Sequence, residues 1–357
     1  MKTGKTLQEL SAEIARQQKA KKDYVLDTQS LEMSLNDNNT AVLTVEHGPA
    51  WGITDVAHSQ IGEWAGIPAK YYGRMRTDAP ALLADNVNHW FAKKHAPRMV
   101  RTLDNDVRAF LSNRFLRLDH VHMMNHVLPV LAESKAEVRS SEITPTRLYI
   151  KSTIPGMEGE VKKGDAVRFG IVFSNSEIGL GKVRAEPFVE RLICLNGMVM
   201  PASDFGHFER SHLGGEQDLT VDGNTIYASD TMEADSQATW LKVRDIMKAF
   251  LCKDTTEKLL GMLRQSTEQK ISGDIPGAVT TVAKMMELNQ DEESAVLRYL
   301  VEGGDITQWG IANAVTRMAA DVASYDRATE LEVAGGRIID LKPGEWQTIA
   351  TAKPSKN

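Results

Sequence analysis

Hydrophobic and polar residues alternate along several segments in the middle of the chain, as they do in β-strands with one buried face. The clearest segment is 166–176, where apolar side chains occupy every second position: Val167, Phe169, Ile171 and Phe173. The same pattern predicts strands at 142–154 and 182–200, with Pro187 at a bulge or a sheet edge. Residues 31–45 predict a hairpin, because two alternating runs flank a turn rich in Asn and Asp.

Helical periodicity dominates the two ends of the chain. It predicts an N-terminal helix at 6–21, an amphipathic helix at about 79–96, and five successive amphipathic segments after residue 231. The pattern therefore predicts an α+β fold, with a mostly antiparallel sheet in the middle and a helical C-terminal third. The expected divisions are an N-terminal helix with its lead-in strand, an α+β core domain, a helical region and a tail, at residues 1–40, 41–230, 231–340 and 341–357.

Composition narrows the class of protein. Hydrophobic residues make up 42% and charged residues 25%, as in ordinary globular domains. No run approaches the roughly 18 apolar residues of a membrane span, so no membrane partner is expected. The two cysteines, Cys194 and Cys252, form no disulfide framework and no zinc spacing, which favours a reducing cytoplasm. No phosphate-loop, dinucleotide, metalloprotease or nucleophile-elbow motif is present, so we expect no cofactor and no metal, and favour a protein that is not an enzyme.

Charge is distributed unevenly along a chain whose net charge is −6. Residues 90–151 contain 11 basic and 6 acidic residues, a local charge of +5, whereas residues 201–357 contain 16 basic and 25 acidic residues, a charge of −9. A basic block in an acidic protein marks either a surface for an anionic partner or a region that pairs with the acidic C-terminal part.

The stretch 101–120 lies inside this block and interleaves arginines with phenylalanines. Arginines neutralise phosphates and aromatic rings stack on unpaired bases, so this mixture suits single-stranded nucleic acid. The alternative is a half-buried strand whose phenylalanines are core and whose arginines are solvated. The candidate nucleic-acid-binding residues are Arg101, Arg108, Phe110, Arg114 and Arg117.

Three shorter motifs admit a functional and a structural interpretation. Residues 61–72 partly match a helix-turn-helix, but an ordinary helical corner has the same glycine spacing. The turn 177–182 contains two glycines that suit a phosphate cradle or, more simply, a tight hairpin. His207, Glu209 and His212, with Glu177 at a distance, are potential metal ligands at a spacing typical of no known site.

Polar residues also gather where two predicted strands end. In one interpretation Asn175 and Asn196 satisfy backbone groups at turns, while Glu177 pairs with Arg191 across the hairpin. Cys194 lies in an apolar run and is expected to be a packed thiol. In the other interpretation the polar side chains converge at one end of the sheet as a recognition site: Asn175, Ser176, Glu177, Arg191, Asn196 and His212.

Several motifs together resemble a known family. They include "GIPAKYYGRM" (66–75), "SNSEIG" (174–179), "RLICLNGMV" (191–199), "RSHLGG" (210–215) and "YDRATELEVAGG" (325–336), and their order over about residues 40–340 is specific. The chain resembles the phage/plasmid-like protein family, catalogued as domain-of-unknown-function family 932. The resemblance implies genes carried by phages and conjugative elements, and hence DNA replication, recombination or defence.

The resemblance and the Arg/Phe stretch together predict a DNA-metabolism protein of a mobile element. We expect it to bind single-stranded DNA as a homo-oligomer, with single-strand annealing or recombination as the activity that would follow. Two alternatives remain open at this point. One is an enzyme or anti-defence factor that uses the polar sheet-end cluster. The other is an interaction module whose acidic helical third docks a partner protein.

Overall fold

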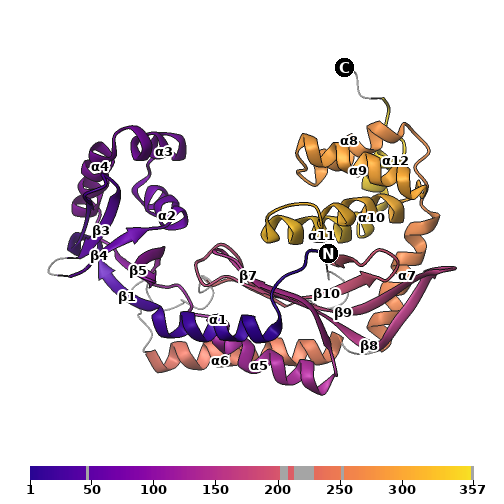
Figure 1. Cartoon of the computed structure of the whole chain (residues 1–357), viewed down its shortest axis with the longest axis horizontal. Helices are drawn as coiled ribbons and strands as arrows, with labels where there is room; N and C mark the ends of the chain where they lie inside the picture. The colour runs from indigo at the N-terminus through magenta and orange to yellow at the C-terminus, as the bar shows by residue number, and fades with distance from the viewer. Residues whose placement is uncertain (46–47, 202–207, 213–228, 251–252, 355–357) are drawn as a thin grey trace.

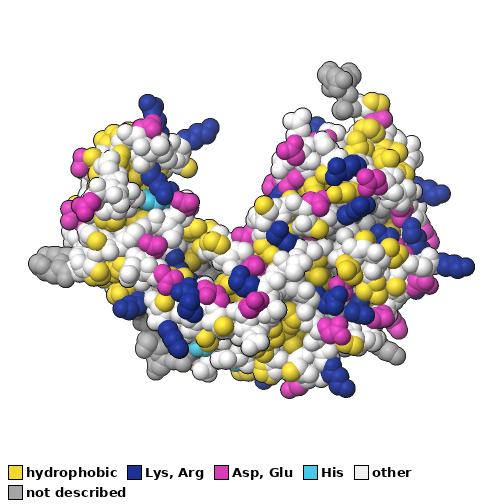
Figure 2. Space-filling view, viewed as in Figure 1, with side chains coloured by type: hydrophobic (Ala, Val, Ile, Leu, Met, Phe, Trp, Pro, Cys, Tyr) yellow, Lys and Arg dark blue, Asp and Glu magenta, His cyan; other side chains and the backbone are white. Residues whose placement is uncertain are grey.

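The computed structural model describes residues 1–45, 48–201, 208–212, 229–250 and 253–354. Within these residues the chain has the predicted α+β architecture, and the strands of its middle part form two six-stranded sheets. Figure 1 shows a U-shaped molecule in which the N-terminal elements form one arm and the C-terminal helices form the other. The space-filling view in Figure 2 shows that the space between the two arms is open.

The first sheet builds the N-terminal lobe, residues 22–112, with the strand order β1-β5-β6-β4-β3-β2. All neighbours are antiparallel except β4 and β6. The predicted hairpin at 31–45 is confirmed as β2 and β3, and the helix predicted at about 79–96 is α4. The elements are β1 (Lys22–Asp27), β2 (Leu31–Leu35), β3 (Ala41–Val45), β4 (Ala50–Ile53), α2 (Asp55–Ala65), α3 (Ala69–Asp78), α4 (Pro80–Lys93), β5 (Pro97–Leu103) and β6 (Asp106–Ser112).

The second sheet, which we call the body sheet, has the order β11-β10-β9-β8-β7, and β12 pairs with β10. Every pair in it is antiparallel. The four apolar residues that alternate along β9 are all buried, as their spacing predicts. The strands are β7 (Glu137–Ile143), β8 (Leu148–Lys162), β9 (Asp165–Asn175), β10 (Val183–Arg191), β11 (Asn196–Val199) and β12 (Phe208–Arg210).

Helices enclose the body sheet in two hydrophobic clusters. Ile171 and Phe173 pack with α1 (Leu7–Ala20), α5 (His120–Glu133) and α6 (Ser229–Phe250), which lie together below the sheet in Figure 1. The other cluster joins the sheet to the C-terminal helices through side chains such as Trp309. These helices are α7 (Lys253–Glu268), α8 (Ile275–Met285), α9 (Gln290–Gly303), α10 (Gln308–Met318), α11 (Tyr325–Ile339) and α12 (Pro343–Ala350).

Two segments differ from the sequence-based expectation. The strand predicted at 182–200 is interrupted after Arg191 by a turn, and Leu195 in that turn has a φ of 53°. The apolar alternation continues through the turn, but Ile193 and Leu195 are exposed, so the pattern there reflects no buried face. The segment 341–357, expected as a tail, contains α12, whose Trp346 is buried.

Candidate functional site

The turn that follows β9 begins with buried polar residues. The side chain of Glu177 is only 3% exposed, and one of its oxygens accepts a 2.6 Å hydrogen bond from the backbone N–H of His120, the first residue of α5. The ammonium of Lys21 lies 3.3 Å from the same oxygen, and Arg108 donates to the other oxygen. Because negative charge is stabilised at a helix N-terminus, Glu177 anchors α5 as well as the two cations.

Arg101 connects Glu177 with two aspartates. Its fully buried side chain donates to both carboxylate oxygens of Asp23 at 2.8 and 3.0 Å, to Asp119 at 2.7 Å and to the backbone carbonyl of Glu177 at 2.8 Å. Lys21 also pairs with Asp119, at 2.8 Å. Three cations therefore balance three carboxylates in what we call the Glu177 network: Lys21, Asp23, Arg101, Arg108, Asp119 and Glu177. Its members come from both the N-terminal lobe and the body, so the network joins these two parts.

The electrostatics of the network follow from this pairing. Burial alone would raise the pKa of the Glu177 carboxyl, but its electrostatic interactions with His120 and with the cations Arg108, Lys21 and Arg101 outweigh burial and hold that pKa well below its ordinary value. Burial would likewise raise the pKa of Asp119, and Arg101 reverses the effect, so the net shift is downward. Both carboxyl groups are therefore ionised at neutral pH, and each forms ion pairs with neighbouring cationic side chains.

Asn175 links two buried histidines beside the network. Its amide nitrogen donates to the Leu118 carbonyl at 2.7 Å and lies 3.1 Å from Nδ1 of His120, while its oxygen lies 3.1 Å from Nε2 of His212. Burial lowers the pKa of His120, and it lowers the pKa of His212 to about 4. Both rings are therefore neutral near pH 7, which suits a packed polar joint better than a proton-transfer site.

A groove opens between the N-terminal lobe and the turn that follows β9. It has a volume of about 560 Å³, and α2, β5 and β6 line one wall while the turn and His212 line the other. Gln60 connects the two walls, because its amide nitrogen donates to the Ile178 carbonyl at 2.8 Å and its oxygen accepts from the N–H of Phe110 at 2.7 Å. We call this feature the inter-lobe groove.

Aromatic and cationic side chains meet in the inter-lobe groove. The guanidinium of Arg98 lies 4.9 Å over the ring of Phe110 and donates to the Phe110 carbonyl at 3.2 Å, but its buried Nε has no hydrogen-bond partner. Burial lowers the pKa of Arg98 to about 10, so the side chain stays positively charged at neutral pH. Trp64 is half-buried in one wall, and Phe115 stacks on His212 with ring centroids 4.9 Å apart.

The turn itself requires its first glycine. Gly179 has a φ of +80°, and a Cβ there would lie 2.8 Å from a methyl group of Leu111. Ser176 stabilises the turn, since its hydroxyl donates to the Thr146 carbonyl at 2.8 Å and accepts from the N–H of Leu180 at 3.2 Å. The turn ends at Lys182, which lines the groove and pairs with Glu209.

The comparisons with known proteins bear on the body sheet. A family model with the description Domain of unknown function (DUF932) matches residues 126–337, more than half of the chain. The chain belongs to the DUF932 family. No curated protein and no solved structure matches the sequence. The family predicted from the motifs is thus confirmed, whereas an origin in phages or plasmids remains a prediction.

In this DUF932 protein the matched residues run from α5 to α11 and contain the whole body sheet. They supply the Gly179 turn and His212, which form one wall of the inter-lobe groove. The opposite wall, with Trp64 and Arg98, comes from residues that precede the match. Among the helices of the described residues, none is long and apolar enough to cross a membrane.

The structure separates the predicted nucleic-acid-binding residues of the DUF932 protein into two groups. Arg101 is fully buried and Arg108 is paired with Glu177, so the surface role expected for Arg101 is corrected to a core role. Phe110 is buried as well, but it lines the inter-lobe groove. Arg114 is exposed and its guanidinium has no ion pair within the described residues; it stands between the groove residues Ser112 and Phe115. Arg117 is 49% exposed, 4.0 Å from Asp23.

The predicted sheet-end cluster divides in the same way. Asn175, Ser176, Glu177 and His212 gather at the inter-lobe groove, but Arg191 and Asn196 lie at the β10–β11 turn. The predicted pair of Glu177 with Arg191 is wrong: Arg191 makes a bidentate pair with Asp165 at 2.7 and 2.8 Å. Cys194 is exposed instead of packed, because it belongs to the turn that interrupts the predicted strand.

The remaining motifs of the DUF932 protein have structural explanations. Residues 61–72 form a corner between α2 and α3, in which Gly66 has a φ of +73° and the Tyr72 hydroxyl lies 2.9 Å from His58 Nδ1. Reading of DNA by this corner remains a prediction. His207 lies outside the described residues, Glu209 pairs with Lys182, and the described part of the chain contains no group of three side chains suited to holding a metal.

Sequence reasoning missed half of the Glu177 network and most of the groove. Lys21, Asp23 and Asp119 are ordinary charged residues at element boundaries, and nothing in their spacing predicts that they meet. Arg98 and Trp64 are likewise isolated in the sequence. Asp119 is the N-cap residue of α5, and its position carried a usable signal, since a carboxylate there favours a helix N-terminus.

Proposed function

We propose that this DUF932 protein binds single-stranded nucleic acid in the inter-lobe groove. The proposal is carried by one observation: a groove of about 560 Å³ combines cationic side chains, aromatic rings and a turn with two glycines. Proteins that bind single strands without sequence preference use this combination, because cations track the phosphates while rings stack on unpaired bases. The groove takes individual nucleotides, whereas a duplex hides its bases from such rings.

Each part of the groove has a role in this proposal. Arg98 and Lys182 offer positive charge from opposite walls, and the exposed Arg114, whose guanidinium has no ion pair within the described residues, stands between the groove residues Ser112 and Phe115 in the chain. Trp64 offers a half-buried indole for stacking. A Cβ at Gly181 would lie 2.9 Å from Nε of Arg147, so this glycine makes room for the Arg147 side chain beside the turn. Glu63 also lines the groove and Glu209 pairs with Lys182, so the positive charge that this proposal uses comes chiefly from Arg98 and Arg114, in a chain whose net charge is −6.

The Glu177 network supports a scaffold role for the neighbouring polar residues. Glu177 is buried, ionised and occupied by cations, and the two histidines are neutral. These properties favour a structural role over a catalytic one: the network is a rigid joint that positions the two walls of the groove. Assembly into homo-oligomers and a role in annealing or recombination are part of the proposal, since one groove contacts few nucleotides and adjacent copies along a strand would raise the overall affinity.

Binding of a fluorescent 40-nucleotide single strand, measured by anisotropy across a salt titration, tests the proposal. We expect the single strand to bind more tightly than a duplex of the same length, with a steep salt dependence. Arg114→Ala and Lys182→Ala should each weaken binding by about threefold to tenfold and reduce the salt slope by roughly 0.7. The matched control is Arg244→Ala, because the Arg244 side chain on α6 is 41% exposed and, among the described residues, forms an ion pair only with its neighbour Asp245.

Three results would oppose the proposal. Absence of binding at low salt would remove nucleic acid as the ligand. Equal affinity for the single strand and the duplex would contradict recognition of unpaired bases in the groove. A loss of affinity in Arg244→Ala as large as that in Arg114→Ala would indicate diffuse attraction to positive charge in place of a defined groove.

A further inference from the structure

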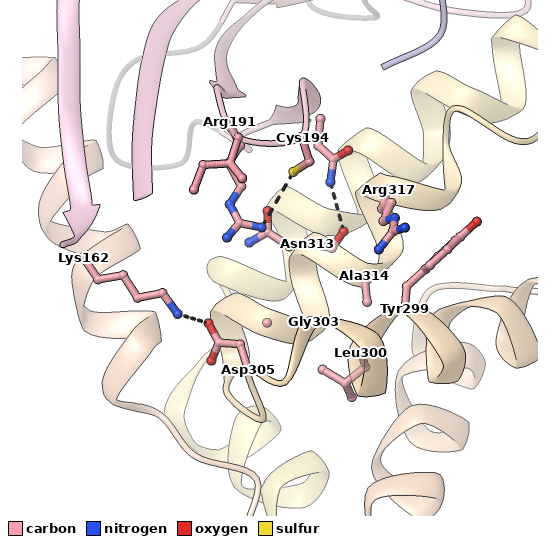
Figure 3. A pocket seen from close by; sticks show the side chains of 13 residues that line it. Lys162, Arg191, Cys194, Tyr299, Leu300, Gly303, Asp305, Asn313, Ala314 and Arg317 are labelled. Carbon is pink, nitrogen blue, oxygen red and sulfur yellow. Dashed lines mark hydrogen bonds and ion pairs between the residues drawn. The ribbon is translucent and has the colours of Figure 1, made fainter. Parts of the chain in front are cut away.

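A second pocket lies at the opposite end of β10 from the inter-lobe groove. It has a volume of about 230 Å³ and is formed by the end of β8, the β10–β11 turn, α9 and α10 (Figure 3). Its walls contain the exposed thiol of Cys194 together with three cationic side chains, those of Lys162, Arg191 and Arg317. We call it the Cys194 pocket, and the function proposed above makes no use of it.

Arg191 is held in one orientation beside the thiol. Two of its nitrogens pair with Asp165, whose side chain is only 2% exposed and also accepts a 2.9 Å hydrogen bond from the indole N–H of Trp309. The remaining terminal nitrogen, Nη1, lies 3.7 Å from the sulfur of Cys194, and Figure 3 shows the two groups pointing toward one another. A fixed guanidinium therefore lies next to the exposed thiol, where it can meet a ligand that approaches the sulfur.

Two buried amides leave acceptors open in the same pocket. Asn196 is 4% exposed and donates to the Asn313 carbonyl at 3.3 Å, while Asn313 is 6% exposed and donates to the Trp309 carbonyl at 2.8 Å. These donations fix which end of each amide is the oxygen. Within the described residues neither side-chain oxygen accepts a hydrogen bond, and neither oxygen is fully buried, so both are open to a donor from outside the protein. Open acceptors in a pocket indicate a ligand that carries N–H or O–H donors.

The rim of the pocket favours an anion. Arg317 is 47% exposed and lies 4.3 Å over the ring of Tyr299, beside the pocket opening in Figure 3. Lys162 stands on the other side and pairs with Asp305 at 2.6 Å. Asp165 and Glu302 pair with Arg191 and Arg317 from outside the lining, so each cation of the pocket has a carboxylate partner. The side chains of Lys162 and Arg317 are nevertheless 46% and 47% exposed, so both can still contact an anion in the pocket.

We propose that Cys194 is a modification site, and that its pocket takes a small anionic disulfide of the glutathione class and forms a mixed disulfide with it. Each feature matches that class: carboxylates suit Arg317 and Lys162, peptide N–H groups suit the open oxygens of Asn196 and Asn313, and the disulfide meets the thiol. The proposal is independent of nucleic-acid binding.

The reaction is an exchange that needs no further reagent. The Cys194 thiol loses its proton to solvent, and the thiolate attacks one sulfur of the small disulfide. A bond forms between the Cys194 sulfur and that sulfur, the original S–S bond breaks, and the other half leaves as a thiolate that takes up a proton. Cys194 is oxidised, the small disulfide is reduced, and excess thiol reverses the reaction.

The test compares two disulfides on the full-length protein. Oxidised glutathione is anionic, whereas 2-hydroxyethyl disulfide is neutral, and the rate of adduct formation at the peptide containing Cys194 is followed by mass spectrometry. We expect oxidised glutathione to react at least about fivefold faster at Cys194. The adduct should be absent from that peptide in Cys194→Ser.

A matched pair of arginine variants separates the pocket from general surface charge. Arg317 and Arg298 both stack on Tyr299 and both lie within 4.0 Å of Glu302, but only Arg317 lines the pocket. Arg317→Gln should remove most of the preference for oxidised glutathione and leave the rate with the neutral disulfide unchanged. Arg298→Gln should retain the wild-type preference. The proposal is overturned if Cys194 forms no adduct with excess oxidised glutathione, if the two disulfides react equally, or if Arg298→Gln lowers the preference as much as Arg317→Gln does.

Discussion

Replacement of Glu177 by glutamine tests whether the Glu177 network joins the two parts of the molecule. The change preserves the shape of the side chain but leaves three cations opposite two carboxylates in a buried site. Breaking a buried ion pair by neutralising one partner costs about 3–5 kcal/mol, because the remaining charge stays desolvated. The 2.6 Å hydrogen bond from His120 also loses its ionised acceptor. We therefore expect Glu177→Gln to lower the free energy of unfolding by about 3–5 kcal/mol.

Urea denaturation of four proteins measures this effect as a double-mutant cycle. Arg108→Gln removes the cation that pairs with Glu177, so the double variant regains a balance of two cations and two carboxylates. Its loss should be smaller than the sum of the single losses by about 1–3 kcal/mol. The exposed pair of Arg16 with Asp104 provides the control, and Asp104→Asn should change the stability little. A loss below about 1 kcal/mol for Glu177→Gln, or strict additivity, would refute the reasoning.

Two further predictions concern stability. Burial lowers the pKa of His58 and of His212 to about 4, so between pH 4 and about 6.5 the unfolded chain binds more protons than the folded chain, and the free energy of unfolding falls as the pH falls. From about pH 7.5 to about pH 5 each ring should lower the free energy of unfolding by roughly 2 kcal/mol. Denaturation measured across this interval would contradict the assignment if the stability did not change. A Cβ at Gly62 would lie 2.8 Å from the buried Tyr72 ring, so Gly62→Ala should destabilise the protein by about 1–3 kcal/mol. Gly261 on α7 has open space around it, so Gly261→Ala should stabilise the protein by roughly 0.5–1 kcal/mol. Equal effects of the two variants in thermal denaturation would show that the Tyr72 contact is irrelevant.

The sequence predicted the elements better than their arrangement. Periodicity identified the hairpin at 31–45, the strand along 166–176 and the C-terminal helices, because each of these has one buried face. It could not divide the strands into two sheets, since strand pairing is set by contacts between residues far apart in the chain. Periodicity also predicted one continuous strand at 182–200, because Ile193 and Leu195 continue the alternation in the turn although both are exposed.

The site was predictable only in part, for a related reason. The polar residues after β9 do converge, and sequence position indicated this because they share one strand end. Their partners come from α1, β5 and β6, and burial of a charged side chain has no signature in a single sequence. Arg101 illustrates the difficulty. Its position among phenylalanines suits a nucleic-acid surface, but in the folded chain its buried side chain pairs with the carboxylates of Asp23 and Asp119 and lies near the charge of Glu177.

The two walls of the inter-lobe groove come from two different parts of the chain, so the residues matched by the family model form only one of them. Residues 126–337 supply the Gly179 turn and Lys182, whereas Trp64 and Arg98 come from the N-terminal lobe. The two walls keep their spacing because the Glu177 network and Gln60 cross between them. A groove that exists only where two parts meet depends on the rigidity of the joint, and buried, fully paired charges hold one geometry because any displacement leaves a charge without its partner. In the function proposed above, Asn175, Ser176 and Glu177 would therefore act at a distance from the nucleic acid by fixing the walls of the groove, whereas His212 lines one wall itself.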